Sequence, residues 1–171
     1  MTHEILTTNI NSKIILINGQ KLQVFEDGRV DRWYSGYFKT IKNTNNNNGY
    51  NRIICNTEKY YRHRIIGFAF LGLDIDDLTL QIDHKNGDKL NNNVSNLRIT
   101  DASGNTKNIT TAKGYYWNKR DKKYKSQIMV NDNSIHLGCF EKEEDARNAY
   151  LKAKEIHHII PEYNPELKIF I

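Results

Sequence analysis

The chain has 171 residues, with 25 Lys or Arg against 20 Asp or Glu, so its formal net charge is +5. Hydrophobic residues make up 38% of the sequence, which favours small modules over one large core. Its two cysteines form no CxxC pair, which argues against a zinc ribbon or zinc finger. No apolar run is long enough to span a bilayer and no secretory pattern opens the chain, so we expect a soluble, intracellular protein without a membrane partner.

The first segment, residues 1–56, is expected to be a β-rich lead-in. Residues 13–17 are apolar and β-branched, and residues 21–25 alternate polar with apolar, so both are predicted strands. An Asn-Gly or Asp-Gly dipeptide follows each of them, as in a tight turn. The asparagine-rich tract at 43–49 indicates a loop, and a further short strand is expected at 50–56.

The second segment, residues 57–110, has the outline of a ββα unit. A short buried helix is expected at 63–70 and a strand at 78–84. An Asn- and Gly-rich loop then leads to a second strand at 96–100. A polar helix starting near Asp101 should follow, although Gly104 weakens that prediction.

The third segment, residues 113–160, is expected to be a sheet of three strands with one helix. The strands are predicted at 114–117, 124–130 and 134–139. Residues 140–146 should open the helix, with acidic side chains in its first turn, where the helix dipole favours them. The tail, 161–171, is apolar enough to pack on the body of the protein, but the sequence does not place it. The expected fold class is therefore α+β.

Three residues of the second segment carry groups suited to phosphodiester hydrolysis. That reaction needs a base that takes a proton from water and a divalent cation that neutralises charge on the phosphate. Asp83 and Asn105 offer the oxygen ligands that a hard cation prefers, and His84 offers an imidazole. Because neighbouring residues of a strand point to opposite faces, Asp83 and His84 can serve one site only where the strand ends.

Residues 82–98, IDHKNGDKLNNNVSNLR, resemble the core of the HNH endonucleases in the subgroup of phage and intron homing enzymes. Residues 62–71, RHRIIGFAFL, are similar to the helix that precedes this core. The resemblance extends over about residues 49–109, with several blocks in the right order and at the right spacing. It implies a ββα-metal nuclease core that cleaves duplex DNA.

The resemblance also implies a role for each matching residue. His84 would be the general base, and Asp83 a metal ligand. Asn96 would brace the loop and orient the histidine, and Asn105 would be the second metal ligand. Many relatives carry histidine there, so this chain would be an HNN variant; Asn108, almost one turn on, is an alternative ligand. The implied cofactor is one divalent cation, Mg²⁺ or alternatively Mn²⁺, with no small-molecule cofactor.

Simpler interpretations remain for single residues. An isolated Asp-His pair is usually a surface feature, and asparagine tracts are common in chains of this composition. His63, on the apolar helix, is expected to be a packed structural histidine. Arg64 and Arg98 could each contact phosphate or pair with an acid; Arg98 is nearer the expected site and is the one we assign to DNA.

Residues 114–128, GYYWNKRDKKYKSQI, then IHLGCF at 135–140 and the acidic helix, are similar to the Apetala-type (AP2) DNA-binding domain. That family reads the major groove with the face of its three-stranded sheet. The matching DNA-binding residues would be Tyr116, Lys119, Arg120, Lys123, Lys125, Gln127 and His136. Leu137 and Phe140 are expected to be core, and the basic residues could instead form a solvated hairpin.

The function expected from these patterns is metal-dependent cleavage of double-stranded DNA. A monomer would nick one strand and a homodimer would cut both. A phage, virus or mobile element would encode such an enzyme, which would act in the cytoplasm or nucleus of the host. The alternative is a catalytically inactive AP2-type regulator that binds specific DNA sequences; a structural or RNA-binding protein is a third candidate.

Overall fold

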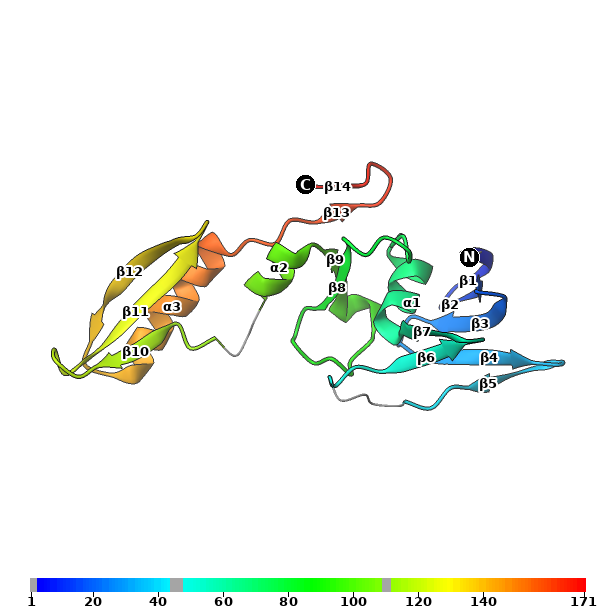
Figure 1. Cartoon of the computed structure of the whole chain (residues 1–171), viewed down its shortest axis with the longest axis horizontal. Coiled ribbons are helices and arrows are strands. Elements are labelled where there is room, and N and C mark those ends of the chain that lie inside the picture. Colours follow the sequence, from blue (N-terminus) through cyan, green and yellow to red (C-terminus); the bar gives the residue numbers. More distant parts are fainter. Residues whose placement is uncertain (1–2, 44–47, 109–111) are drawn as a thin grey trace. The chain divides into compact units, whose positions relative to one another are not determined.

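A computed structural model of the chain describes residues 3–43, 48–108 and 112–171. It confirms a mixture of helices and many strands (Figure 1). The chain divides into two compact units: unit 1 is Met1–Asn105 with Pro161–Ile171, and unit 2 is Thr106–Ile160. Part of the loop predicted at 43–49 lies outside the described residues. Among the residues described, no helix combines the length and the apolarity that crossing a membrane requires.

Unit 1 begins with a five-stranded antiparallel meander, which we call the N-terminal sheet. Its strands are β1 (His3–Asn9), β2 (Ser12–Ile17), β3 (Gln20–Phe25), β4 (Val30–Tyr34) and β5 (Tyr37–Thr40). The strands predicted at 13–17 and 21–25 are confirmed as β2 and β3. Ile15 pairs with Leu22, and the alternate residues Ile17 and Val24 are buried with them, because one face of the sheet is covered.

The rest of unit 1 builds two hairpins around one helix. Strands β6 (Arg52–Cys55) and β7 (Glu58–Tyr61) form a hairpin that leads into helix α1 (Arg62–Phe70). Strand β8 (Gln81–His84) then pairs antiparallel with β9 (Leu97–Thr100), after the 3₁₀ turn η1 (Val94–Asn96). Helix α2 (Ala102–Lys107) follows β9. The strand predicted at 78–84 is thus shorter than expected, because residues 78–80 form no ladder.

One hydrophobic core joins these parts of unit 1. Its buried members come from the N-terminal sheet, from β6, from α1 and the segment after it, and from β8 and β9. Tyr163 and Phe170, in the short strands β13 (Tyr163–Asn164) and β14 (Ile169–Phe170), pack against the same core. The apolar tail is therefore part of unit 1. Each fully buried Ile or Leu contributes about 1.5–3 kcal/mol, so this shared core is the main force that holds the elements of unit 1 together.

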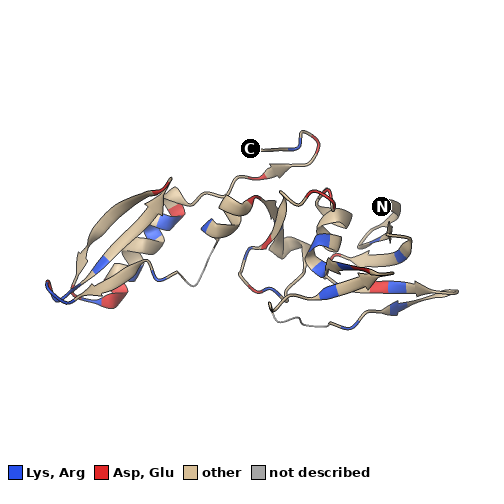
Figure 2. Ribbon diagram, viewed as in Figure 1, with Lys and Arg blue, Asp and Glu red and all other residues tan. Residues whose placement is uncertain are grey.

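Unit 2 is a three-stranded antiparallel sheet with one helix on it. Strands β10 (Tyr115–Asn118), β11 (Lys123–Val130) and β12 (Asn133–Phe140) lie in that order, and helix α3 (Glu143–His157) packs on β11 and β12. The helix was predicted to open at Phe140; that is wrong, because Phe140 still pairs with Tyr124 in the sheet. The basic residues between β10 and β11 lie together at the tip of their hairpin (Figure 2).

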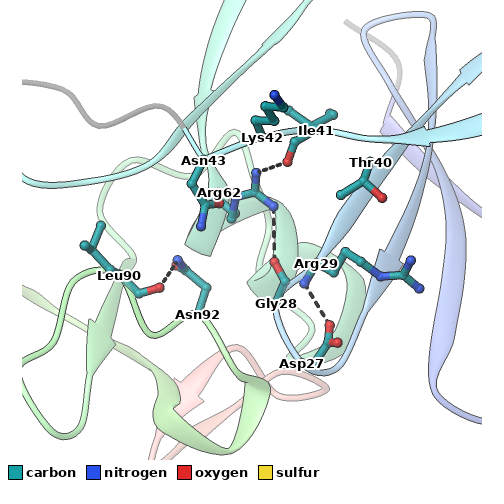
Figure 3. A pocket seen from close by; sticks show the side chains of 10 residues that line it. All are labelled: Asp27, Gly28, Arg29, Thr40, Ile41, Lys42, Asn43, Arg62, Leu90 and Asn92. Atoms are coloured by element: carbon teal, nitrogen blue, oxygen red, sulfur yellow. Dashed lines mark hydrogen bonds between the residues drawn. The ribbon is translucent and has the colours of Figure 1, made fainter.

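Two polar contacts attach the N-terminal sheet to the elements that follow it. Arg62, at the start of α1, is buried, and its guanidinium donates hydrogen bonds to the carbonyl oxygens of Gly28 (3.2 Å) and Ile41 (3.0 Å) (Figure 3). Gly28 has φ +90°, and a Cβ there would lie 2.7 Å from the carbonyl oxygen of Asn92. Two residues on, the Val94 N–H donates to the Glu26 carbonyl at 2.8 Å. The β3–β4 turn therefore rests directly on the loop that ends at η1.

Substituting Gly28 tests this close approach, and Gly36 offers a matched control. Both glycines have positive φ, but a Cβ at Gly36 would meet nothing within 4 Å. We expect Gly36→Ala to lower the free energy of unfolding by about 1–2 kcal/mol through backbone strain alone. Gly28→Ala should cost about 1–3 kcal/mol more, because the methyl group must displace the Asn92 backbone. Urea unfolding followed by circular dichroism measures both; equal losses would contradict the contact.

Candidate active site

Asp83 and His84 are the last two residues of β8, and both are buried, with 5% and 4% of their surface exposed. Across the ladder, Asp83 faces Arg98 and His84 faces Leu97. Because side chains alternate along a strand, the two residues lie on opposite faces of the β8–β9 pair. The end of β8 therefore presents a carboxylate to one side and an imidazole to the other.

Arg98 pairs with Asp83 on one face. Its Nε and Nη2 lie 2.8 Å and 2.7 Å from Asp83 Oδ2. Such a pair compensates a carboxylate that burial would otherwise destabilise. Arg98 was expected either to pair with an acid or to contact DNA. The structure shows the pair with Asp83, and contact with DNA stays a prediction. Arg64 instead donates to the backbone carbonyls of Leu80, Ile75 and Asp77.

Asn105 lies over the face of β8 that carries Asp83. Its Nδ2 donates to Gln81 Oε1 at 2.7 Å. Gln81 precedes Asp83 by two residues, which puts both side chains on the same face, about 6.6 Å apart along the strand. In this arrangement the Asn105 amide oxygen, Oδ1, is the end that is not used by Gln81. Asn108, the alternative ligand, follows the end of α2.

The oxygen donors on this face fit a hard divalent cation in kind. Asp83 supplies a carboxylate and Asn105 an amide oxygen, and Mg²⁺ is usually held by few protein oxygens because it keeps several waters. Among the described residues, no three His, Cys, Asp or Glu side chains group in a way that could hold a metal ion. A site built from Asp83 and Asn105 would therefore depend on water and phosphate for its remaining ligands.

Asn96 ties together the two ends of the loop between β8 and β9. Its Oδ1 accepts from the Asn86 N–H at 3.1 Å, and its Nδ2 donates to the Asn91 carbonyl at 2.8 Å. Its own carbonyl accepts from the Lys85 N–H at 2.8 Å. These side-chain-to-backbone bonds are of the kind expected for a loop brace, while the catalytic importance of Asn96 stays a prediction.

His84, on the other face, is enclosed by rings and one amide. The His63 ring meets it edge-on, with centroids 5.2 Å apart, and Tyr50 lies at 6.0 Å. His63 in turn stacks on Tyr61, with an interplanar angle of 7°. The Nε2 of His84 lies 3.3 Å from Asn92 Oδ1. These contacts restrict both the tilt and the rotation of the His84 ring.

The two histidines are held in their neutral forms. Burial lowers the pKa of His84 below its ordinary value, although the hydrogen bond that its ring donates to Asn92 and the carboxylates of Asp83 and Asp88 act against it. Burial, and to a smaller extent His84 and Arg64, together lower the pKa of His63 to about 3. His84 is therefore unprotonated at neutral pH, as a base must be, and His63 can pack against it without adding charge.

Three residues of the site were not singled out from the sequence. Asn92 stands within a run of asparagines, where no single position is distinguishable by pattern. Gln81 could have been found, because strand alternation places it on the face of Asp83. Tyr50 is distant in sequence and comes to His84 only through the fold.

In unit 2, the strand register puts four of the predicted DNA-binding residues on one face. Tyr116 pairs with Lys125, and Gln127 pairs with His136. The alternate residues Ser126 and Ile128 are buried, with Ile128 packed on Tyr150 of α3. Tyr116, Lys125, Gln127 and His136 therefore lie on the face away from α3, which we call the open face.

Several cations of unit 2 have acidic neighbours. Lys125 lies 2.7 Å from Asp121, Arg120 lies 3.4 Å from Asp121, and Lys123 lies 4.0 Å from Glu141. Lys119 is exposed in the turn after β10. Exposed pairs of this kind contribute little, so these cations can exchange partners at low cost. Their contact with DNA stays a prediction.

Comparison with known proteins identifies one segment of the chain. Residues 60–107 match the family model of the HNH endonucleases. This HNH segment contains α1, β8, β9 and α2, and with them Asp83, His84, Asn96 and Asn105. The expected resemblance to HNH endonucleases is confirmed for these residues, whereas the AP2 resemblance of 113–158 stays a prediction.

The chain is also similar to a solved structure described as "DNA binding and cleavage by the HNH homing endonuclease I-HmuI". The two share 27% sequence identity with a TM-score of 0.44, and the match covers 63% of this chain and 57% of the other. The chain thus spans little more than half of that protein. No curated protein sequence matches the chain.

The buried, neutral His63 predicts how unit 1 responds to acid. Its folded-state pKa of about 3 lies below its ordinary 6.5, so between these values the unfolded chain binds a proton that the folded chain does not. Stability should fall as the pH falls through this window, with His63 contributing up to about 1.4 kcal/mol per pH unit. His63→Phe, which keeps a ring on Tyr61, should reduce this slope in urea unfolding at pH 4–7. Identical pH profiles for variant and wild type would contradict the burial of a neutral His63.

Proposed function

We propose that the chain is a metal-dependent endonuclease of the HNH homing type that hydrolyses phosphodiester bonds of duplex DNA. The observation that carries the proposal is the end of β8, where a buried carboxylate and a neutral imidazole occupy consecutive positions of the chain within the HNH segment. A base and an oxygen ligand for a cation are the two groups that hydrolysis of a phosphodiester needs.

His84 would take the proton of the attacking water. Asp83 and Asn105 would hold one divalent cation, Mg²⁺ or Mn²⁺, and Asn96 would keep the loop after β8 in place. When bound, the cation neutralises charge on the scissile phosphate and on the leaving oxygen. With one such site, a monomer would nick one strand, and a homodimer would cut both.

The open face of unit 2 is proposed as an AP2-like DNA-binding surface. It carries Lys125, Gln127 and His136, and the basic β10–β11 hairpin borders it (Figure 2). Lys and Arg contacts to phosphate would position the protein, while Gln127 could meet a base edge in the major groove. The net charge of +5 supports a polyanionic partner.

The second candidate is a DNA-binding regulator without cleavage activity. The observation in its favour is the Arg98–Asp83 ion pair, in which two guanidinium nitrogens contact the same oxygen of the proposed metal ligand. A cation would have to share Asp83 with this guanidinium or displace it. Binding of DNA would then remain, while hydrolysis would be slow or absent.

Cleavage of supercoiled plasmid separates these candidates. With Mg²⁺ or Mn²⁺, wild type should convert supercoiled DNA to nicked or linear forms, and EDTA should stop it. His84→Ala should slow cleavage by about 10²–10⁴-fold, because the general base is lost. His157→Ala is the control, since His157 is exposed on α3 and should cut like wild type. DNA binding without cleavage in any metal would exclude the enzyme and favour the regulator.

The open face is tested by single substitutions, because deleting residue 114 onward would also remove β13 and β14 from unit 1. Lys125→Ala should weaken binding to a labelled duplex, and the slope of log K against log salt should fall by about one. Lys152→Ala removes the same charge from an exposed site on α3 and is the control. Fluorescence anisotropy at several salt concentrations measures both. Equal slopes for the two variants would refute a DNA contact at Lys125.

A further inference from the structure

Asn92 contacts His84 and has no role in the proposed hydrolysis so far. Asn92 is 5% exposed, and its side chain stands between His84 and the backbone of its own loop. We propose that Asn92 is the positioning residue that fixes the proton of His84 on Nε2, so that the base accepts the proton of water at Nδ1. This inference rests on the proposed function of His84.

The orientation of the Asn92 amide follows from Leu90. Asn92 Nδ2 lies 3.0 Å from the carbonyl oxygen of Leu90. A carbonyl oxygen can only accept, so the amide atom facing it must be the NH₂ group. The reversed amide would bring two acceptors together. The oxygen of the amide therefore points at His84.

The tautomer of His84 follows from that orientation. Asn92 Oδ1 has no proton to donate, so the ring nitrogen 3.3 Å away must be the donor. A neutral imidazole carries one proton, which then sits on Nε2, and its basic lone pair is on Nδ1. A ring turned over about its Cβ–Cγ bond would present carbon to Oδ1 and lose the hydrogen bond.

Asn92 is itself held by the N-terminal sheet. Gly28 packs against its backbone so closely that a Cβ would lie 2.7 Å from the Asn92 carbonyl oxygen. The Asn92 N–H donates to the Leu90 carbonyl at 3.1 Å. Asn92 also lines a cleft of about 320 Å³ together with Gly28 and Arg62 (Figure 3). The position of Asn92 Oδ1, the acceptor for His84, therefore depends on the packing of the β3–β4 turn against the loop between β8 and β9.

The chemical step gives Asn92 a second effect. As the oxygen of water bonds to phosphorus, its proton moves to Nδ1, and the phosphorus–oxygen bond to the leaving sugar breaks, with the electron pair staying on the leaving oxygen. His84 becomes an imidazolium, with both nitrogens protonated. Its Nε2–H still donates to Asn92 Oδ1, and a hydrogen bond from a charged donor is stronger than one from a neutral donor. Asn92 would therefore stabilise the base after it has taken the proton.

Nuclear magnetic resonance of the ¹⁵N-labelled full chain, without DNA or metal at pH 7.5, tests the tautomer directly. The signal of His84 is identified among the six histidines by its absence in His84→Ala. We expect the ring proton of wild type on Nε2, retained in Asn92→Asp, which keeps an acceptor. In Asn92→Leu, which has none, this signal should broaden or shift as the proton redistributes. If Asn92→Leu does not fold, Asn92→Ala replaces it.

Asn93→Ala is the control for general damage to the loop. Asn93 Oδ1 accepts from the N–H and the hydroxyl of Ser95, at 2.9 Å and 2.7 Å, so this side chain holds the start of η1. This variant should loosen the loop and leave the His84 tautomer unchanged. A wild-type proton on Nδ1, or an Nε2 signal that is the same in Asn92→Leu, would overturn the proposal.

Kinetics separate positioning from binding. Asn92→Leu should lower kcat for plasmid nicking by about 10- to 100-fold with little change in KM, because only the orientation of the base is lost. Asn92→Asp should recover part of that loss. An unchanged kcat in Asn92→Leu would refute the positioning role. If wild type cuts no DNA, the proposed function fails, while the resonance experiment still decides whether Asn92 fixes the tautomer.

Discussion

Side chains alternate along a strand, and at the end of β8 this constraint gives two neighbouring residues different surroundings. Asp83 pairs across the ladder with Arg98. It lies on the same face of β8 as Gln81, which accepts a hydrogen bond from Asn105. His84 faces the rings of α1 and the asparagine loop. The face with Asp83 is polar and supplies oxygen atoms that could bind a cation. The face with His84 is buried, which keeps its imidazole neutral. The alternation of side chains along β8 is therefore what separates the Asp83 carboxylate from the His84 imidazole.

The surroundings of His84 depend in turn on elements far away in sequence. Tyr50 comes from the segment before β6, and Asn92 is pressed into place by Gly28 of the N-terminal sheet. From the start of α1, Arg62 donates hydrogen bonds to the carbonyls of Gly28, in the β3–β4 turn, and of Ile41, just after β5. The N-terminal sheet therefore shapes the site as well as adding to the core.

Local pattern was enough to predict β2, β3, α1, β9 and the three strands of unit 2, because their periodicity and turn residues are strong. It missed β1, β4, β5 and β7, whose sequences are polar and take their strand form from pairing with neighbours. For the site, the motif indicated Asp83, His84, Asn96 and Asn105 as candidates, and their roles stay predictions. Asn92 could not be chosen among its identical neighbours, since what distinguishes it is the position of a backbone carbonyl and of a glycine distant in sequence.

Unit 1 consists of two segments of the chain, one before unit 2 and one after it. Tyr163 and Phe170 complete the packing of its core, and they follow all of unit 2 in sequence. On the ribosome, residues 106–160 would emerge and be able to fold while the core of unit 1 still lacked its last hairpin. The order of synthesis would thus make the sheet of unit 2 available before the hydrophobic core of unit 1 is complete.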